Sequence, residues 1–168
     1  LYELAEYSEI KKELKKGGGA VSVAGCVDAQ KWHMAYGLGD GYKFKIIATF
    51  SELHAREIFD QFRAYDRNTL LYPAKDLIFY QADIHGNQQT KERIRVLKRL
   101  LQKKPITIVT TFDALMAPQV PLSVYEESII SLKKGEEVNL TELSEKLVAL
   151  GYEKTYQVET PGQFAVRG

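Results

Sequence analysis

A glycine and a lysine stand at the spacing that nucleotide-binding proteins use to hold phosphate. Gly25 is followed, after four residues, by Gln30, Lys31 and Trp32. The phosphate-binding loop has a second glycine before its lysine and a serine or threonine after it. Glutamine at position 30 hinders the backbone amides from closing around phosphate, and an indole cannot hold magnesium as a hydroxyl does. We therefore predict a degenerate nucleotide site, with a working motor domain or a chance match as the alternatives.

A run of cations in one predicted helix could bind phosphate in a different way. The segment from residue 87 to residue 104 carries seven basic side chains against one acid, Glu92. The seven are Lys91, Arg93, Arg95, Lys98, Arg99, Lys103 and Lys104. Such a face is typical of contacts to nucleic-acid phosphates, so Lys91, Arg95 and Lys98 are candidate DNA contacts. The alternative is a solvated outer helix, which the small overall charge favours.

The histidines and the cysteine do not occur at the spacings of a metal site or a catalytic site. His33, His54 and His85 lie in separate segments without a carboxylate at ligand spacing, so we predict no metal site. Cys26 is the single cysteine, which excludes an internal disulfide and favours a reducing compartment, here the cytoplasm. No catalytic residue is predicted.

Length and composition describe a folded chain with no strong overall field. The 168 residues are 45% apolar and 27% charged, which excludes wholesale disorder. The net charge of +1 gives no whole-protein attraction to nucleic acid or to a membrane. Apolar runs stay far below the roughly 20 residues of a membrane span. Because the first residue is Leu1 and not methionine, we expect a piece of a longer protein.

Strands and helices alternate through the first two thirds of the chain. Apolar runs predict strands at 20–25, 44–48, 69–72 and 106–109. Amphipathic patterns predict helices at 1–16, at 29–36, from Ser51 onward and at 87–104, and 73–86 is irregular and aromatic-rich. The alternation predicts an α/β fold over residues 20–117, with a parallel sheet flanked by helices on both faces.

The pattern changes after residue 117. Pro118 and Pro121 indicate a linker, and the rest predicts a strand at 128–132, a helix at 140–150, and strands at 155–159 and 163–166 joined by a turn. We therefore predict three parts: an N-terminal helix at 1–19, the α/β domain at 20–117, and part of a small α+β domain at 118–168. The last of these ends on an unclosed strand.

Four segments together resemble the N-terminal region of bacterial transcription-repair coupling factors, the Mfd family. In chain order they are GGGAVSVAGCVDAQK, YPAKDLIFYQADIHGNQQTKERIRVLKRLL, ITIVTTFDALM and SLKKGEEVNLTELSEKLVALGYEKTYQVETPGQFAVRG. The most specific parts are the Tyr-Pro segment with its downstream aspartate and the run from Leu132 to Gly168.

The resemblance implies a large ATP-driven DNA translocase that displaces stalled RNA polymerase and recruits nucleotide excision repair. Residues 20–117 would be a UvrB-like, helicase-like domain 1a that has lost its nucleotide site, and 118–168 the start of a truncated UvrA-binding domain 2. ATP and magnesium would act in the parent's motor, with no cofactor in this chain. The strand-separating hairpin of UvrB has no counterpart between Tyr80 and the basic helix. The implied partners are UvrA, other domains of the parent, and RNA polymerase and DNA through the parent.

The same resemblance implies that Arg167 faces UvrA. If Phe164 and Val166 pack inward on a strand, Arg167 points outward, where a guanidinium can pair with acidic groups. The leading hypothesis is an interaction module without catalysis of its own. A nucleotide-binding motor domain and a DNA-backbone-binding module are the alternatives.

Overall fold

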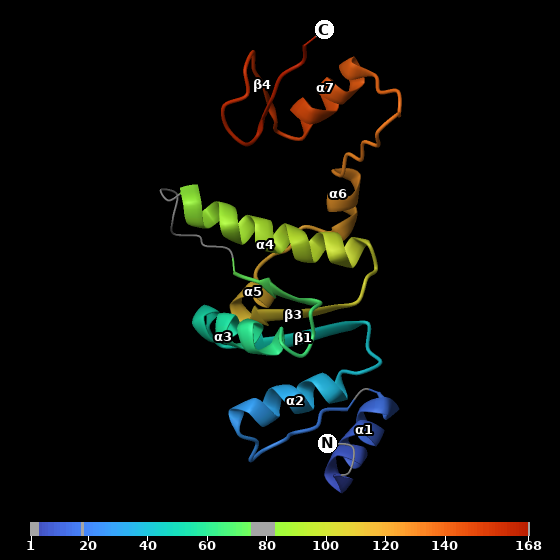
Figure 1. Cartoon of the computed structure of the whole chain (residues 1–168), viewed down its shortest axis with the longest axis vertical. Coiled ribbons are helices and arrows are strands. Elements are labelled where there is room, and N and C mark those ends of the chain that lie inside the picture. The colour runs from blue at the N-terminus through green and yellow to red at the C-terminus, as the bar shows by residue number, and fades with distance from the viewer. Residues whose placement is uncertain (1–3, 18, 75–82, 168) are drawn as a thin grey trace. The chain divides into compact units, whose positions relative to one another are not determined.

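The computed structural model describes residues 4–17, 19–74 and 83–167 (Figure 1). The chain divides into two compact units, Leu1–Gln119 and Val120–Gly168, here called unit 1 and unit 2. In the described residues, no helix is both long and apolar enough to cross a membrane.

Unit 1 is built on a parallel sheet, as the alternating pattern predicts. Its strands β1 (Phe44–Thr49), β2 (Thr69–Tyr72) and β3 (Ile106–Thr111) lie in the order β1-β3-β2, and both pairings are parallel. All six residues of the central strand β3 are buried. The strand runs two residues beyond the predicted 109, because Thr110 and Thr111 still pair with Ala48 and Thr49 of β1. Their hydroxyls also donate to Tyr72 O and to the Glu52 carboxylate.

Helices cover both faces of this sheet, also as predicted. On one face α3 (Glu52–Phe62) forms a core cluster with the sheet, and α2 (Asp28–Leu38) packs against it through Trp32. On the other face α4 (Asp83–Leu101) and α5 (Phe112–Met116) form a second cluster (Figure 1). The buried members of the first are Ala55, Ile58, Phe62, Leu71 and Val109, and those of the second are Tyr72, Val96, Ile106, Ile108 and Ala114.

The helix ends follow the local chemistry of the sequence. Helix α3 begins after Ser51, as predicted, and Ser51 caps it: its hydroxyl accepts a hydrogen bond from His54 N at 3.2 Å. The N-terminal helix α1 (Ala5–Lys16) ends at Gly17, whose φ of 73° suits glycine. Helix α4 begins before the predicted residue 87. Residues 75–82, within the predicted aromatic segment, lie outside the described residues.

The predicted strand at 20–25 is wrong. The segment forms no strand, and Val21 and Val23 are both exposed. Among the described residues, the two edges of the sheet belong to β1 and β2, and neither pairs with this segment. An apolar run indicates only that a strand would be stable if a sheet edge received it; without that pairing the chain stays irregular.

Unit 2 contains two short helices and two very short strands. These are α6 (Leu122–Glu127), α7 (Leu140–Ala149), β4 (Glu153–Lys154) and β5 (Gln163–Phe164). The helix predicted at 140–150 is confirmed. The strand predicted at 128–132 is wrong, because α6 precedes it and ends where the Ser128 hydroxyl donates to Val124 O. Ile129 beyond it is half exposed and lies in no sheet.

The strands predicted at 155–159 and 163–166 are also wrong in extent and pairing. β4 consists of the two residues directly before the first predicted strand. It pairs with β5 in parallel and not as an antiparallel hairpin. The Gln163 side chain holds the intervening loop. Its Oε1 accepts from Glu159 N and Thr160 N, at 3.0 and 3.2 Å, and its Nε2 donates to Glu153 Oε2 at 3.1 Å. The Gln163 side chain thus stabilises a loop that, in a hairpin, backbone hydrogen bonds between the two strands would stabilise.

Candidate functional site

The Gly25 loop lacks the strand that places a phosphate-binding loop against a helix. Gly25 has a φ of 81° in an open bend, and α2 begins without a side-chain cap. Trp32 stands where the magnesium-binding hydroxyl would be, and its Nε1 donates to Gln61 Oε1 at 2.7 Å. Because the indole also packs on the core cluster of α3, its role is to hold α2 against α3. The residues present therefore do not fit a magnesium nucleotide, and a P-loop helicase-like domain is not confirmed.

Among the described residues, the carboxyl edge of the sheet, where open α/β sheets bind ligands, exposes two aromatic side chains. Phe50 follows β1 with 76% of its surface exposed, and Phe112 follows β3 with 56% exposed. Glu52 is committed to the fold, because its Oε1 accepts from Ala74 N at 2.8 Å and from Thr111 Oγ1 at 3.2 Å. The described residues at this edge therefore suit contact with another apolar surface better than phosphate binding or acid–base catalysis.

The histidines are held by local contacts. His33 stacks on Tyr65, and His54 stacks on Phe50 while its Nδ1 lies 3.2 Å from Glu57 Oε2. In the described parts of the chain, no three His, Cys, Asp or Glu side chains gather as metal ligands. The side chain of His85 lies outside the described residues.

The predicted cationic helix has two kinds of basic residue. Arg93 is buried, and Arg99 is partly buried and donates to Asn68 Oδ1, so both serve the fold. Lys91, Arg95 and Lys98 are exposed on the opposite side of α4. The side opposite Arg93 thus carries the three residues that the sequence predicts as candidate DNA contacts, with Arg99 beside Arg95 at its margin.

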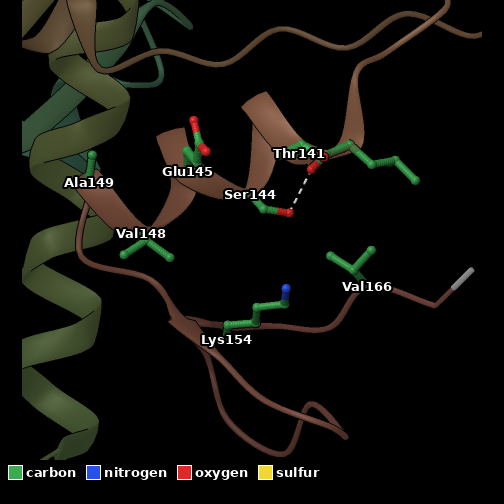
Figure 2. A pocket seen from close by; sticks show the side chains of 8 residues that line it. Thr141, Ser144, Glu145, Val148, Ala149, Lys154 and Val166 are labelled. Atoms are coloured by element: carbon green, nitrogen blue, oxygen red, sulfur yellow. Dashed lines mark hydrogen bonds between the residues drawn. The ribbon is translucent and has the colours of Figure 1, made fainter.

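Unit 2 carries an open groove of about 600 Å³ between α7 and the end of the described chain (Figure 2). Its wall is mainly apolar: Val148 on α7 lies across the groove from Val166, and Leu140 also lines it. The Glu145 carboxylate and the Lys154 ammonium give it one charge of each sign. The groove could therefore receive an apolar side chain flanked by polar groups.

No described side chain of unit 2 is fully buried. Leu143 and Leu147 on α7, and Leu150 directly after it, are partly buried. Leu140 and Val148 form a second apolar row that remains more than half exposed. A unit this small with this little burial gains stability when another surface covers it.

The position of α7 is fixed by its two ends. Asn139 Oδ1 accepts from Thr141 N at 3.0 Å and from Glu142 N at 3.3 Å, which satisfies two unpaired amides of the first turn. At the other end Gly151 has a φ of 88°, which stops the helix.

Replacing Asn139 by alanine is expected to destabilise α7 by about 1 kcal/mol, because both amides lose their acceptor. Faster native-state hydrogen exchange of the α7 amides would show this. Asn139→Asp is the matched control, because it keeps the acceptor and adds a charge that suits a helix N-terminus. Equal exchange in Asn139→Ala and the unaltered chain would contradict the capping role.

Arg167 directly follows Val166, the last residue that lines the groove, and does not line it itself. β5 ends at Phe164, so the strand alternation expected to turn Arg167 outward is not formed there. The side chain is nevertheless exposed, and among the described residues it makes no hydrogen bond or ion pair. Sequence reasoning named Arg167 but missed the groove; the second apolar row of α7, Leu140 and Val148, was the available signal.

Comparisons with known proteins point to the same part of the chain. Residues 130–168 match the UvrB interaction domain, which places α7, β4, β5 and Arg167 within the matched region. The chain is also similar in sequence to proteins from several bacteria that share one name. It is 29% identical over 103 residues to the transcription-repair-coupling factor of Bacillus subtilis, covering 61% of this chain and 9% of that protein.

The protein of the same name from Staphylococcus haemolyticus is 28% identical over 97 residues, covering 58% of this chain and 8% of that relative. The matched region therefore spans less than a tenth of the length of these relatives. The resemblance predicted from the sequence is confirmed by both kinds of comparison.

Proposed function

We propose that this chain is the N-terminal interaction module of a transcription-repair coupling factor and recruits UvrA to stalled RNA polymerase in nucleotide excision repair. The observation that carries the proposal is the position of the UvrB interaction domain match. Residues 130–168 contain both the apolar groove and the exposed Arg167.

The chemistry of this surface suits a protein partner. An exposed arginine beside an apolar pocket is a typical centre of binding energy, because the guanidinium pairs with a carboxylate while the pocket excludes water. Arg167 has no internal hydrogen bond to break before it binds, among the described residues. Lys154 and Glu145 at the groove can then fix the orientation of the partner.

In this proposal the chain has no catalysis of its own. The loop from Gly25 to Trp32 no longer binds a nucleotide. The translocase activity, with its ATP and magnesium, belongs to the rest of the parent protein. In the cytoplasm, RNA polymerase and the DNA on which the motor moves are contacted through that parent, and the parent's other domains are partners of this chain.

Replacing Arg167 by alanine is expected to weaken UvrA binding about tenfold, because a partner carboxylate loses its bidentate donor. Titration calorimetry with purified UvrA measures this, first with residues 1–168 and then with a longer N-terminal part of the parent protein. Lys146→Ala is the matched control. It removes an exposed positive charge from the same unit, outside the groove, and should leave the affinity unchanged. Unchanged affinity in Arg167→Ala would remove Arg167 from the site.

A further inference from the structure

The solvent side of α4 carries an ordered row of cations. Lys91, Arg95 and Lys98 follow the spacing i, i+4, i+7, which places them on one face of a helix. All three are exposed. We call these three residues the α4 basic face. The face belongs to unit 1, whereas the groove and Arg167 belong to unit 2.

The charges of this face are not neutralised by neighbours. In the described part of the chain, none of the three side chains makes a hydrogen bond or an ion pair. The acid within the run, Glu92, accepts instead from Gln88 Nε2 at 3.0 Å and lies 3.6 Å from Arg56 Nη2. The face is therefore available to an anionic partner at no cost in broken contacts.

The small net charge of the whole chain conceals an uneven distribution. Unit 1 has eighteen basic and fourteen acidic residues, a net charge of +4, and unit 2 has five basic and eight acidic, a net charge of −3. Residues 91–104 contribute +6, so the rest of unit 1 is negative. Five of the basic residues in this range lie on α4, and Lys103 and Lys104 follow its end, so the positive charge of unit 1 is concentrated on α4 and the turn after it.

We propose that the α4 basic face binds the phosphate backbone of double-stranded DNA without reading its sequence. Lys91 and Lys98 are separated by about 10 Å along the helix axis, and one strand of B-DNA carries about three phosphates over such a length. An acidic protein surface is the weaker fit. Protein interfaces rely on apolar or aromatic anchors, and the exposed apolar side chain on the described part of α4 is Ile94 alone.

The test compares two triple variants with the same change in charge. One carries Lys91→Gln, Arg95→Gln and Lys98→Gln; the control carries Lys12→Gln, Lys15→Gln and Lys16→Gln on the exposed side of α1. Binding to a fluorescent 20-base-pair duplex is followed by anisotropy at several salt concentrations. Removing the α4 cations should weaken binding at low salt about tenfold and reduce the slope of log affinity against log salt by about 2 to 3. The α1 variant should change affinity less than about twofold.

Three results would overturn the proposal. These are no binding of the duplex by the unaltered chain at low salt, an equal loss in the two variants, and tighter binding of polyglutamate than of DNA through the same three residues. The last result would assign the face to an acidic protein. UvrA titration of the α4 variant separates this inference from the proposed function, because recruitment through unit 2 should be unaffected.

Discussion

Replacing Arg93 by methionine is expected to lower the free energy of unfolding of unit 1 by about 3 kcal/mol. Arg93 is only 7% exposed, and its guanidinium lies 4.1 Å from the centre of the Tyr72 ring. Nη1 donates to Pro73 O at 2.7 Å, and Nη2 donates to Tyr72 Oη and Gln119 Oε1 at 2.6 and 2.7 Å. Methionine fills the space but leaves these buried oxygens with fewer donors.

The single tryptophan makes this loss measurable in unit 1. Trp32 packs on the core cluster of α3, so its fluorescence follows the unfolding of unit 1 in urea. Arg95→Met is the matched control, because it makes the same change on the exposed side of the same helix and should shift the free energy by less than about 0.5 kcal/mol. A loss in Arg93→Met no larger than in Arg95→Met would show that the buried network does not stabilise the unit.

Arg93 also shows which structural features a sequence pattern can predict and which it cannot. Composition groups it with the other cations of its helix, but its position relative to Val96 and Leu100, at i+3 and i+7, puts it on the buried side. That much could be predicted from the sequence. Its acceptors could not, since Pro73 and Gln119 lie 20 and 26 residues away and meet it only when the sheet has formed.

Some of the predicted strands form and others do not, for the same reason. The runs at 44–48, 69–72 and 106–109 are strands because each finds a neighbour in one sheet, with β3 in the middle. The runs at 20–25 and 128–132 have similar composition but no such neighbour among the described residues. Local preference is visible in a sequence, whereas pairing depends on the whole fold.

The candidate site was predictable only in part. The chemical defect at Gln30 and Trp32 can be read from the residue types, but the indole's hydrogen bond to Gln61 on α3 cannot. The groove beside Arg167 is likewise a product of packing, because it requires α7 and the segment at Val166 to lie face to face. The degenerate nucleotide site therefore stays a prediction from residue types, whereas the groove is visible only in the fold.

Replacing Asp66 by asparagine is expected to lower the free energy of unfolding of unit 1 by about 2 kcal/mol at neutral pH. The Asp66 carboxylate joins three parts of the sheet. Oδ2 accepts from Lys45 Nζ on β1 at 2.9 Å and from Thr107 Oγ1 on β3 at 2.7 Å. Oδ1 accepts from Asn68 N, in the turn before β2, at 2.9 Å. The uncharged amide loses the ion pair and cannot accept all three bonds.

The same contacts make this contribution depend on pH. Burial raises the pKa of the Asp66 carboxyl, but hydrogen bonds from Thr107, Lys45 and Asn68, together with the Lys45 charge, outweigh it, so the pKa in the folded protein lies below its ordinary value. In the unfolded chain the carboxyl titrates near about pH 4. The stabilisation is therefore complete above that pH and disappears as the pH falls through the lower, folded value.

The difference in unfolding free energy between the unaltered chain and Asp66→Asn should then be constant from about pH 5 to 7 and shrink as the pH falls below about 4. Urea titrations followed by Trp32 fluorescence at each pH give this difference directly. The control is Asp60→Asn, which changes an exposed carboxylate on α3 and should shift the free energy by less than about 0.5 kcal/mol at every pH. A difference for Asp66→Asn that stayed constant down to pH 2 would mean that its effect comes from packing and not from the ionised carboxylate. That result would exclude the charge of Asp66 as the link between the strands.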